Sequence, residues 1–395
     1  MPTQMLGWGT TYHLPILLSD RFGADLNLPP EMVFGGLTVM LASSALVAPR
    51  IGRMVDAHGP RWFLIAGSFF AAAGLLTLGN AQGLAGYVCA WVLFGLAMAT
   101  MLGNAAMVAL ARVAGPQARR AISTLLLFTA ANSFVAYPIT TALSGQFGWR
   151  TMCLVYAAAH LIVGLPLQLM IGSVKPAPLA PSHEGHHDED AYGILRQEDR
   201  RPALALLIVA FAANGFIGWG VSPHLVNLLG ALGTPVALAV FLASLHGPAQ
   251  IAGRFMDYGF GARLTPLALG MIAATLAPIA LVGMIFAGQS AIIAFAAIGL
   301  YGVSTGLSTI TRASIPLNLF GRLTYGATLG RITLPMHIAC AIGPIFFASM
   351  IARAGPTATL IVAAAIAMIF VVAILVLDRR MRAAAVVVAA RTADA

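Results

Sequence analysis

The sequence predicts an all-α polytopic membrane protein in which twelve transmembrane helices form two pseudo-symmetric six-helix bundles. Three observations predict it: an apolar composition, twelve apolar segments of spanning length, and a short phrase that occurs twice. Hydrophobic residues make up 59% of the 395 residues and charged residues only 9%, and the mean hydropathy is +0.88. Because a soluble domain carries about 25% charged residues, lipid must surround much of this chain.

The apolar segments fall into two groups of six, and each is near the roughly 20 residues that a helical span needs. The first group covers residues 4–22, 32–51, 62–82, 85–110, 121–144 and 151–172. The second covers residues 203–229, 235–255, 264–287, 290–317, 325–351 and 356–377. The gap between the groups is rich in Pro, His and acidic residues, which cannot build a core. We therefore expect an N-terminal bundle (1–172), a cytoplasmic linker (173–201), a C-terminal bundle (202–378) and a cytoplasmic tail (379–395).

The distribution of Arg and Lys predicts the orientation in the membrane. If both termini are cytoplasmic, 17 of the 22 basic residues face the cytoplasm and 3 face the opposite side. Short cytoplasmic loops carry such an excess, so we expect an integral protein of a bacterial-type inner (plasma) membrane. The same excess explains the net charge of +9 without a nucleic-acid partner.

Three repeated features indicate that one half of the chain duplicates the other. The pattern G-W-G-x-x-x-H-L occurs twice, 211 positions apart. The first copy is Gly7-Trp8-Gly9-Thr10-Thr11-Tyr12-His13-Leu14, and the second is Gly218-Trp219-Gly220-Val221-Ser222-Pro223-His224-Leu225. Gly52-Arg53-Met54-Val55-Asp56 recurs at offset 201 as Gly253-Arg254-Phe255-Met256-Asp257, and Pro138 pairs with Pro344 at offset 206. The order is the same in both halves, which predicts a parallel repeat about an axis along the membrane normal.

Two groups of six spans, a long central gap and the motif between the second and third spans resemble the major facilitator superfamily of secondary transporters. The family pattern in that loop is roughly G-x-x-x-D-R-x-G-R-R, and Gly52, Asp56, Gly59 and Arg61 match it in place. Ala57 stands where the family has Arg, which puts part of its charge network in doubt. The aromatic first span and the lack of carboxylates within the spans resemble the monocarboxylate and oxalate–formate group. The resemblance implies a monomer and a gate formed by Gly52, Asp56, Gly59, Arg61, Gly253, Arg254 and Asp257. The alternative for this motif is a topological anchor of basic residues beside the membrane. We expect no cofactor and no bound metal.

Ionisable residues within spans are costly and therefore mark functional sites. No Asp or Glu lies well inside a predicted span, which argues against a carboxylate-driven pump for cationic drugs. Arg312 follows a run of small and hydroxyl residues, and an anionic ligand or helix-end carbonyls are its alternative partners. Arg331 lies near the cytoplasmic interface, where snorkelling and ligand contact are both open. His337, six residues further on, projects from a different face.

The repeated His13 and His224 are the remaining strong candidates, because the resemblance implies that their helices line the cavity. Trp8, Tyr12 and Trp219 would supply an aromatic lining, and ordinary helix packing is the alternative for all five residues. His160 and His246 are interpreted as helix contacts. The three cysteines show no metal spacing, and the linker histidines are interpreted as part of a solvated segment.

The hypothesis is a secondary active transporter of a small organic anion or weak acid that works by rocker-switch alternating access. Arg312 would bind the anion, and His13 and His224 would orient the substrate or carry a proton, since imidazole titrates near neutral pH. The alternative within transport is an exporter of neutral or amphiphilic molecules. A membrane enzyme or receptor is the remote alternative, because the sequence shows no nucleophile–base set, metal cluster or output domain.

Overall fold

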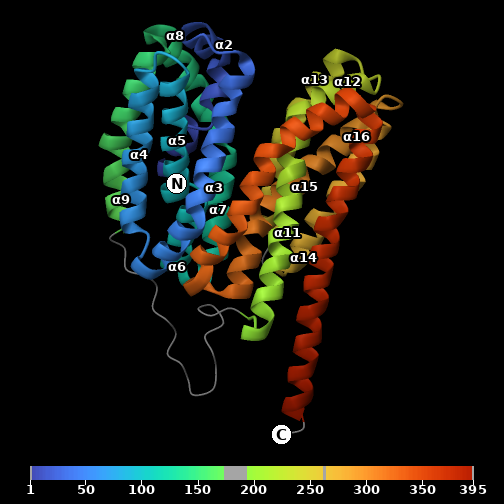
Figure 1. Ribbon diagram of the computed structural model, residues 1–395. Helices are drawn as coiled ribbons and strands as arrows, with labels where there is room; N and C mark the ends of the chain where they lie inside the picture. The colour runs from blue at the N-terminus through green and yellow to red at the C-terminus, as the bar shows by residue number, and fades with distance from the viewer. Residues whose placement is uncertain (1, 173–193, 261–263, 394–395) are drawn as a thin grey trace. The chain divides into compact units, whose positions relative to one another are not determined.

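The computed structural model describes residues 2–172, 194–260 and 264–393, and its described part consists of helices and turns without a strand (Figure 1). Two compact units account for the chain. The first comprises residues 1–192 together with 321–338, and the second comprises residues 193–320 together with 339–395. A segment from the second half of the sequence is therefore part of the first unit.

The first unit contains most of the helices of the N-terminal half. In chain order they are α1 (Pro2–Thr10), α2 (Leu14–Leu26), α3 (Pro30–His58), α4 (Arg61–Gly79), α5 (Leu84–Met101), α6 (Asn104–Ala114), η1 (Gly115–Gln117), α7 (Ala118–Ala130), α8 (Asn132–Ala159), the π-helical η2 (His160–Gly164) and α9 (Leu165–Gly172). The unit also holds η4 (Arg322–Thr324) and the start of α16 (Tyr325–Ala393).

The second unit contains α11 (Gln197–Val221), η3 (Ser222–His224), α12 (Leu225–Ala231), α13 (Val236–Phe260), α14 (Pro266–Ile285), α15 (Ala291–Phe320) and α16 from Ala339 onward. The last backbone carbonyls of α15 accept hydrogen bonds from the segment that precedes α11. The backbone N–H groups of Ile194 and Leu195 donate to the carbonyls of Asn318 and Leu319, at 3.3 and 3.2 Å.

Eight helical stretches of the described chain are long and apolar enough to cross a membrane. Two of them, Leu84–Met170 and Arg322–Arg382, run for 87 and 61 residues, which is room for more than one crossing. Gly148 (φ 77°) and Gly355 (φ 83°) interrupt these stretches between predicted spans. Positive φ breaks a right-handed helix, and Gly adopts it without a Cβ clash. The predicted all-α polytopic membrane fold is confirmed, and the eight stretches are consistent with twelve crossings.

A cluster of aromatic rings fixes the helices of the first unit. Phe22 of α2 packs edge-on against Trp149 of α8 with ring centroids 4.9 Å apart, and Trp91 and Phe94 of α5 pack at 5.3 Å. The Tyr87 hydroxyl donates to the carbonyl of Val33 at the start of α3, at 2.6 Å. The Phe22–Trp149 pair joins α2 to α8 and contributes roughly 1 kcal/mol beyond the area it buries, and the Tyr87 hydrogen bond joins α5 to α3.

Several predicted continuous spans are interrupted. A turn at residues 11–13 separates α1 from α2, Gly103 (φ 50°) separates α5 from α6, and η3 separates α11 from α12. Pro15 follows the first turn and Pro223 lies inside η3, and Pro lacks the N–H that a continuous helix needs. Non-helical backbone at membrane depth persists only where protein surrounds it or where it lines a cavity. The interruptions therefore mark places where polar backbone groups are available.

Candidate substrate site and cytoplasmic gate

The first copy of the repeated phrase packs against α8. A Cβ added to Gly9 would meet the Ala136 Cβ at 3.0 Å, so this glycine allows close approach of the two helices. The amide of Asn132, oriented to satisfy both neighbours, donates to the carbonyl of Met5 at 3.0 Å and accepts from the N–H of Gly9 at 2.8 Å. Asn132 is 1% exposed, and its side chain bridges an i, i+4 pair of the α1 backbone.

His13 lies in the turn after α1 among aromatic rings. Its ring stands edge-on to Tyr12 at 5.3 Å and to Tyr137 of α8 at 5.2 Å, and Tyr12 stands edge-on to Trp8 at 5.9 Å. His13 Nδ1 is buried and has no hydrogen-bond partner in the described part of the chain. The predicted residues Trp8, Tyr12 and His13 are thus brought together, and Tyr137 completes the group.

The second copy packs against α16 in the corresponding way. A Cβ on Gly220 would collide with the Phe347 ring, and would approach Gly343 at 3.1 Å. His224 Nε2 lies 3.0 Å from the carbonyl oxygen of Pro344, so this nitrogen carries the hydrogen and donates. Trp219, which precedes Gly220 in the same phrase, is half-buried. Because Pro138 of α8 and Pro344 of α16 are themselves a repeated pair, the duplication extends to these tertiary contacts.

Arg312 lies on α15 in the second unit and is half-buried. Ser308 and Thr311 beside it are 2% and 0% exposed. The half-buried Arg254 of α13 is near enough for the two positive charges to interact. Further along the same helix pair, His246 lies 3.3 Å from the Thr305 hydroxyl and stacks on Tyr301. The second unit therefore holds a positively charged, hydroxyl-rich contact between α13 and α15.

Arg331 and His337 do not belong to this group. Both lie on the part of α16 that belongs to the first unit, whereas Arg312 and His224 lie in the second. Arg331 is exposed, and His337 is 7% exposed. Their different environments agree with the different helix faces that their spacing predicts.

Asp56 binds the start of α16. Its Oδ1 accepts from the N–H of Gly326 at 3.0 Å and its Oδ2 accepts from the N–H of Ala327 at 2.6 Å. The positive end of a helix dipole favours a carboxylate at this place. Gly52, one turn earlier on α3, touches the Gly326 carbonyl so closely that no Cβ would fit between them.

Arg112 supplies the positive charge that Ala57 lacks. This residue of α6 donates to the backbone carbonyl of Asp56, and its guanidinium lies 3.8 Å from the Asp56 carboxylate. Gly59 ends α3 with φ 82°, and the exposed Arg61 lies over the Trp62 ring at 5.6 Å. The motif thus forms one polar cluster at the end of α3.

The second copy of the motif is described in part. A Cβ on Gly253 would meet the carbonyl oxygen of Val303 on α15 at 2.6 Å, which makes Gly253 another close-approach residue. Arg254 lies near Arg312, as above. The Asp257 side chain lies outside the described part of the structure, as do residues 173–193 of the predicted linker.

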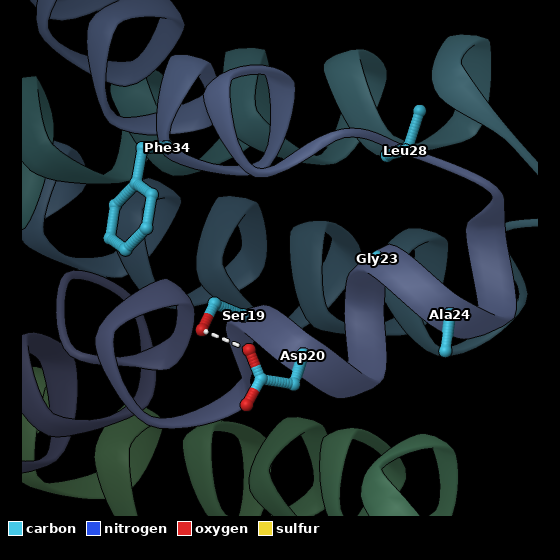
Figure 2. Close-up of a pocket in the computed structure, with 6 residues that line it drawn as sticks. All are labelled: Ser19, Asp20, Gly23, Ala24, Leu28 and Phe34. Atoms are coloured by element: carbon cyan, nitrogen blue, oxygen red, sulfur yellow. Dashed lines mark hydrogen bonds between the residues drawn. The ribbon is translucent and has the colours of Figure 1, made fainter.

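A separate cavity of about 410 Å³ opens between α2 and α3 in the first unit (Figure 2). The Asp20 carboxylate, the Ser19 hydroxyl and the Phe34 ring line it, and Ser19 donates to Asp20 at 3.3 Å. None of the predicted site residues lines this cavity.

Sequence reasoning did not select Arg112, Asn132 or Tyr137 as site residues. A signal for Arg112 was present: it lies 200 positions before Arg312, close to the offset of 201 between the two loop motifs. Asn132 and Tyr137 lie on a helix in which only the pairing of Pro138 with Pro344 is duplicated, so the repeat did not mark them.

Comparison with known families decides the identity of the fold. A family model described as Major Facilitator Superfamily matches residues 3–249, more than half of the chain. The chain belongs to the Major Facilitator Superfamily. It is therefore an integral membrane transporter and not an enzyme. A search of curated protein sequences finds no match.

Solved structures of Major Facilitator Superfamily transporters share the fold. The human organic anion transporter MFSD10 (TETRAN) superposes with a TM-score of 0.72 at 16% identity, over 94% of this chain and 96% of that one. A variant of the E. coli fucose:proton symporter FucP gives a TM-score of 0.64 at 15% identity, with the same coverage of both chains. At these identities the likeness concerns the fold.

Proposed function

We propose that this Major Facilitator Superfamily protein is a secondary transporter of a small organic anion or weak acid. The observation that carries the proposal is the pair of half-buried guanidinium groups, Arg254 and Arg312, on the packed helices α13 and α15. The similarity in fold to a human organic anion transporter supports it.

The physical argument starts from the charge of arginine. Arg keeps its proton at all accessible pH values, and two like charges held close together in a low-dielectric interior repel each other. A carboxylate placed beside them would lower that repulsion and form bidentate hydrogen bonds. The substrate would add to the contacts that both side chains already make. The hydroxyl-bearing residues of α15, Ser308 and Thr311, offer further hydrogen bonds beside Arg312.

The internal repeat favours a second role for Arg312. Arg112 follows Asp56 by 56 positions (112 − 56), and Arg312 follows Asp257 by 55 (312 − 257). Since Arg112 pairs with Asp56, Arg312 is the counterpart of a gate residue. Substrate binding and a gate role predict different consequences for substitution, and the experiment below separates them.

The contact of Asp56, Gly52 and Arg112 with the start of α16 is proposed as the cytoplasmic gate. Alternating access in this family requires contacts on one side of the membrane to separate while those on the other form. The Asp56 carboxylate, which binds the start of α16 beside the Gly52 contact, is suited to such a change. Its hydrogen bonds can break and form again, because no covalent or metal bond is involved. We place both termini and the basic residues Arg53 and Arg61 in the cytoplasm of a bacterial-type inner membrane.

The decisive experiment measures ligand-dependent melting of the purified protein and uptake into proteoliposomes, with a panel of carboxylates and a panel of neutral hydrophobic compounds. Carboxylates are expected to raise the melting temperature of the wild type, and Arg312→Gln is expected to abolish this shift. Arg353→Gln, an exposed arginine of the same unit, is the matched control and should behave as the wild type.

Two other outcomes are equally clear. Carboxylate binding that survives in Arg312→Gln while uptake falls would assign Arg312 to the gate. Stabilisation by neutral compounds and by none of the carboxylates would reject the anion proposal in favour of an exporter of neutral or amphiphilic molecules.

A further inference from the structure

The two repeated histidines occupy equivalent places but have different surroundings. Each lies within a helix interruption, and each contacts the helix that carries the repeated proline. In the second unit the ring is bonded to that helix, and in the first it is not. His13, which occupies the equivalent place without this hydrogen bond, can therefore bind a ligand.

His224 is committed to its own unit. Its Nε2–H donates to the Pro344 carbonyl at 3.0 Å, which ties the interruption between α11 and α12 to α16. A hydrogen bond between membrane helices helps to hold two segments in register. While the bond persists, this nitrogen cannot serve a substrate.

His13 has no comparable bond. Its Nδ1 is buried without a partner, whereas its Nε2 retains accessible surface and forms no hydrogen bond with a described residue. The titratable groups that face the ring are the phenols of Tyr12, in its own turn, and of Tyr137, on α8. Within the described chain, no charged side chain contributes to the electrostatic environment of His13.

Tyr137 offers a second free polar group at the same place. Its ring lies 5.2 Å from that of His13, and its hydroxyl makes no hydrogen bond to the described chain. The Tyr137 hydroxyl oxygen is not fully buried. Tyr156 on the same helix differs, because its hydroxyl is bonded to Thr140 at 2.7 Å. The first unit therefore presents an imidazole and a phenol, side by side, with unused hydrogen-bonding capacity.

The surroundings of His13 make its protonation depend on a ligand. An imidazolium has two N–H donors, and burial of a donor without an acceptor is unfavourable. In the described structure, neither tyrosine hydroxyl accepts a hydrogen bond from the His13 ring. A bound carboxylate would supply both an acceptor and a compensating charge.

We propose that His13 and Tyr137 form the protic contact of the transport site, where His13 takes up one proton together with a carboxylate, and that His224 is a structural tie. The proposal rests on the proposed anion transport. The proton comes from water on the side where the substrate enters, occupies an imidazole nitrogen while the N–H donates to a carboxylate oxygen, and returns to water where the substrate leaves. Tyr137 donates to the same carboxylate.

Nitrogen-15 NMR of histidine-labelled protein in lipid bilayers tests the asymmetry directly. His13→Gln and His224→Gln identify the two signals, and acetate and benzoate are the probes. His13 is expected to shift toward imidazolium at a higher pH when a probe is present, and His224 is expected to keep a hydrogen-bonded Nε2–H throughout. A response of His224 with none from His13, or equal responses from both, would overturn the proposal.

Variants supply a second readout in proteoliposomes. His13→Gln should abolish carboxylate-driven proton uptake and keep the wild-type melting temperature. His224→Ala should lower the melting temperature and keep the proton coupling, and His224→Gln should restore stability, because its amide can donate to Pro344. Wild-type proton coupling in His13→Gln would contradict the proposal.

Tyr137→Phe keeps the ring and removes the hydroxyl, so KM for the carboxylate should rise several-fold while kcat changes little. Tyr156→Phe is the matched control and should leave KM unchanged; equal effects of both substitutions would refute the role of Tyr137. If neither probe binds the wild type, anion transport itself is rejected, and the pH titration without a probe still compares the two histidines.

Discussion

Substitution of Gly52 by Ala tests the contact between α3 and the start of α16. The new Cβ would occupy the place of the Gly326 carbonyl oxygen, which belongs to a helix backbone and cannot rotate away. The two segments must then separate by about an ångström, the scale of a van der Waals overlap. The Asp56 hydrogen bonds, now 2.6 and 3.0 Å long, would stretch beyond bonding range.

The magnitude follows from these two effects. Overpacking of one methyl group costs about 1–3 kcal/mol, and loss of a hydrogen bond to a charged, 11%-exposed carboxylate costs about 1.5–3 kcal/mol. Together these effects give about 2.5–6 kcal/mol, which corresponds to roughly a hundredfold shift or more toward the separated arrangement. Asp56→Asn keeps one acceptor and the close contact, so its effect should be nearer tenfold.

The assay is a spin-label distance distribution between Met54 on α3 and Leu323 in η4, whose side chains are 47% and 37% exposed. The wild type should show one short distance, and Gly52→Ala should shift most of the population to a longer one. Gly35→Ala on the same helix is the control, since its Cβ would meet nothing within 4 Å. Ala also favours helix over Gly, so weakened helicity is excluded as a cause. A wild-type distribution in Gly52→Ala would refute the reasoning.

Two further substitutions test the close contacts of the repeated segments. Asn132→Ala removes the side chain that bridges the N–H of Gly9 and the carbonyl of Met5. The melting temperature measured by calorimetry should fall by the equivalent of about 1–3 kcal/mol. An unchanged melting temperature would show that water or the helical hydrogen bond satisfies these two groups instead. Gly253→Ala drives a methyl group toward the Val303 carbonyl, 2.6 Å from its Cβ position, and should lower stability by about 1–3 kcal/mol in a denaturation series; equal stability would show that α13 and α15 can move apart freely.

Much of the proposed gate could be anticipated from local sequence. The spacing of Gly52 and Asp56 on one helix predicts a glycine contact beside a helix-capping carboxylate, because i and i+4 share a face. The partner was beyond such reasoning. Gly326 lies 270 positions from Asp56, and only folding brings its N–H within 3.0 Å.

For the candidate site too, the sequence predicts some features and the tertiary structure decides others. Apolar segments and basic loops predict a membrane protein and a repeated phrase predicts its duplication, because hydrophobicity and charge act on each segment independently of its neighbours. The transporter role came from the resemblance of the loop motif and from the family match. Whether a repeated histidine is bonded depends on which carbonyl a second helix presents. His224 meets Pro344, and His13 meets the Tyr137 ring. Two copies of one sequence pattern thus acquire different chemistry, and only the tertiary structure decides it, because hydrogen bonds form between atoms that packing brings together.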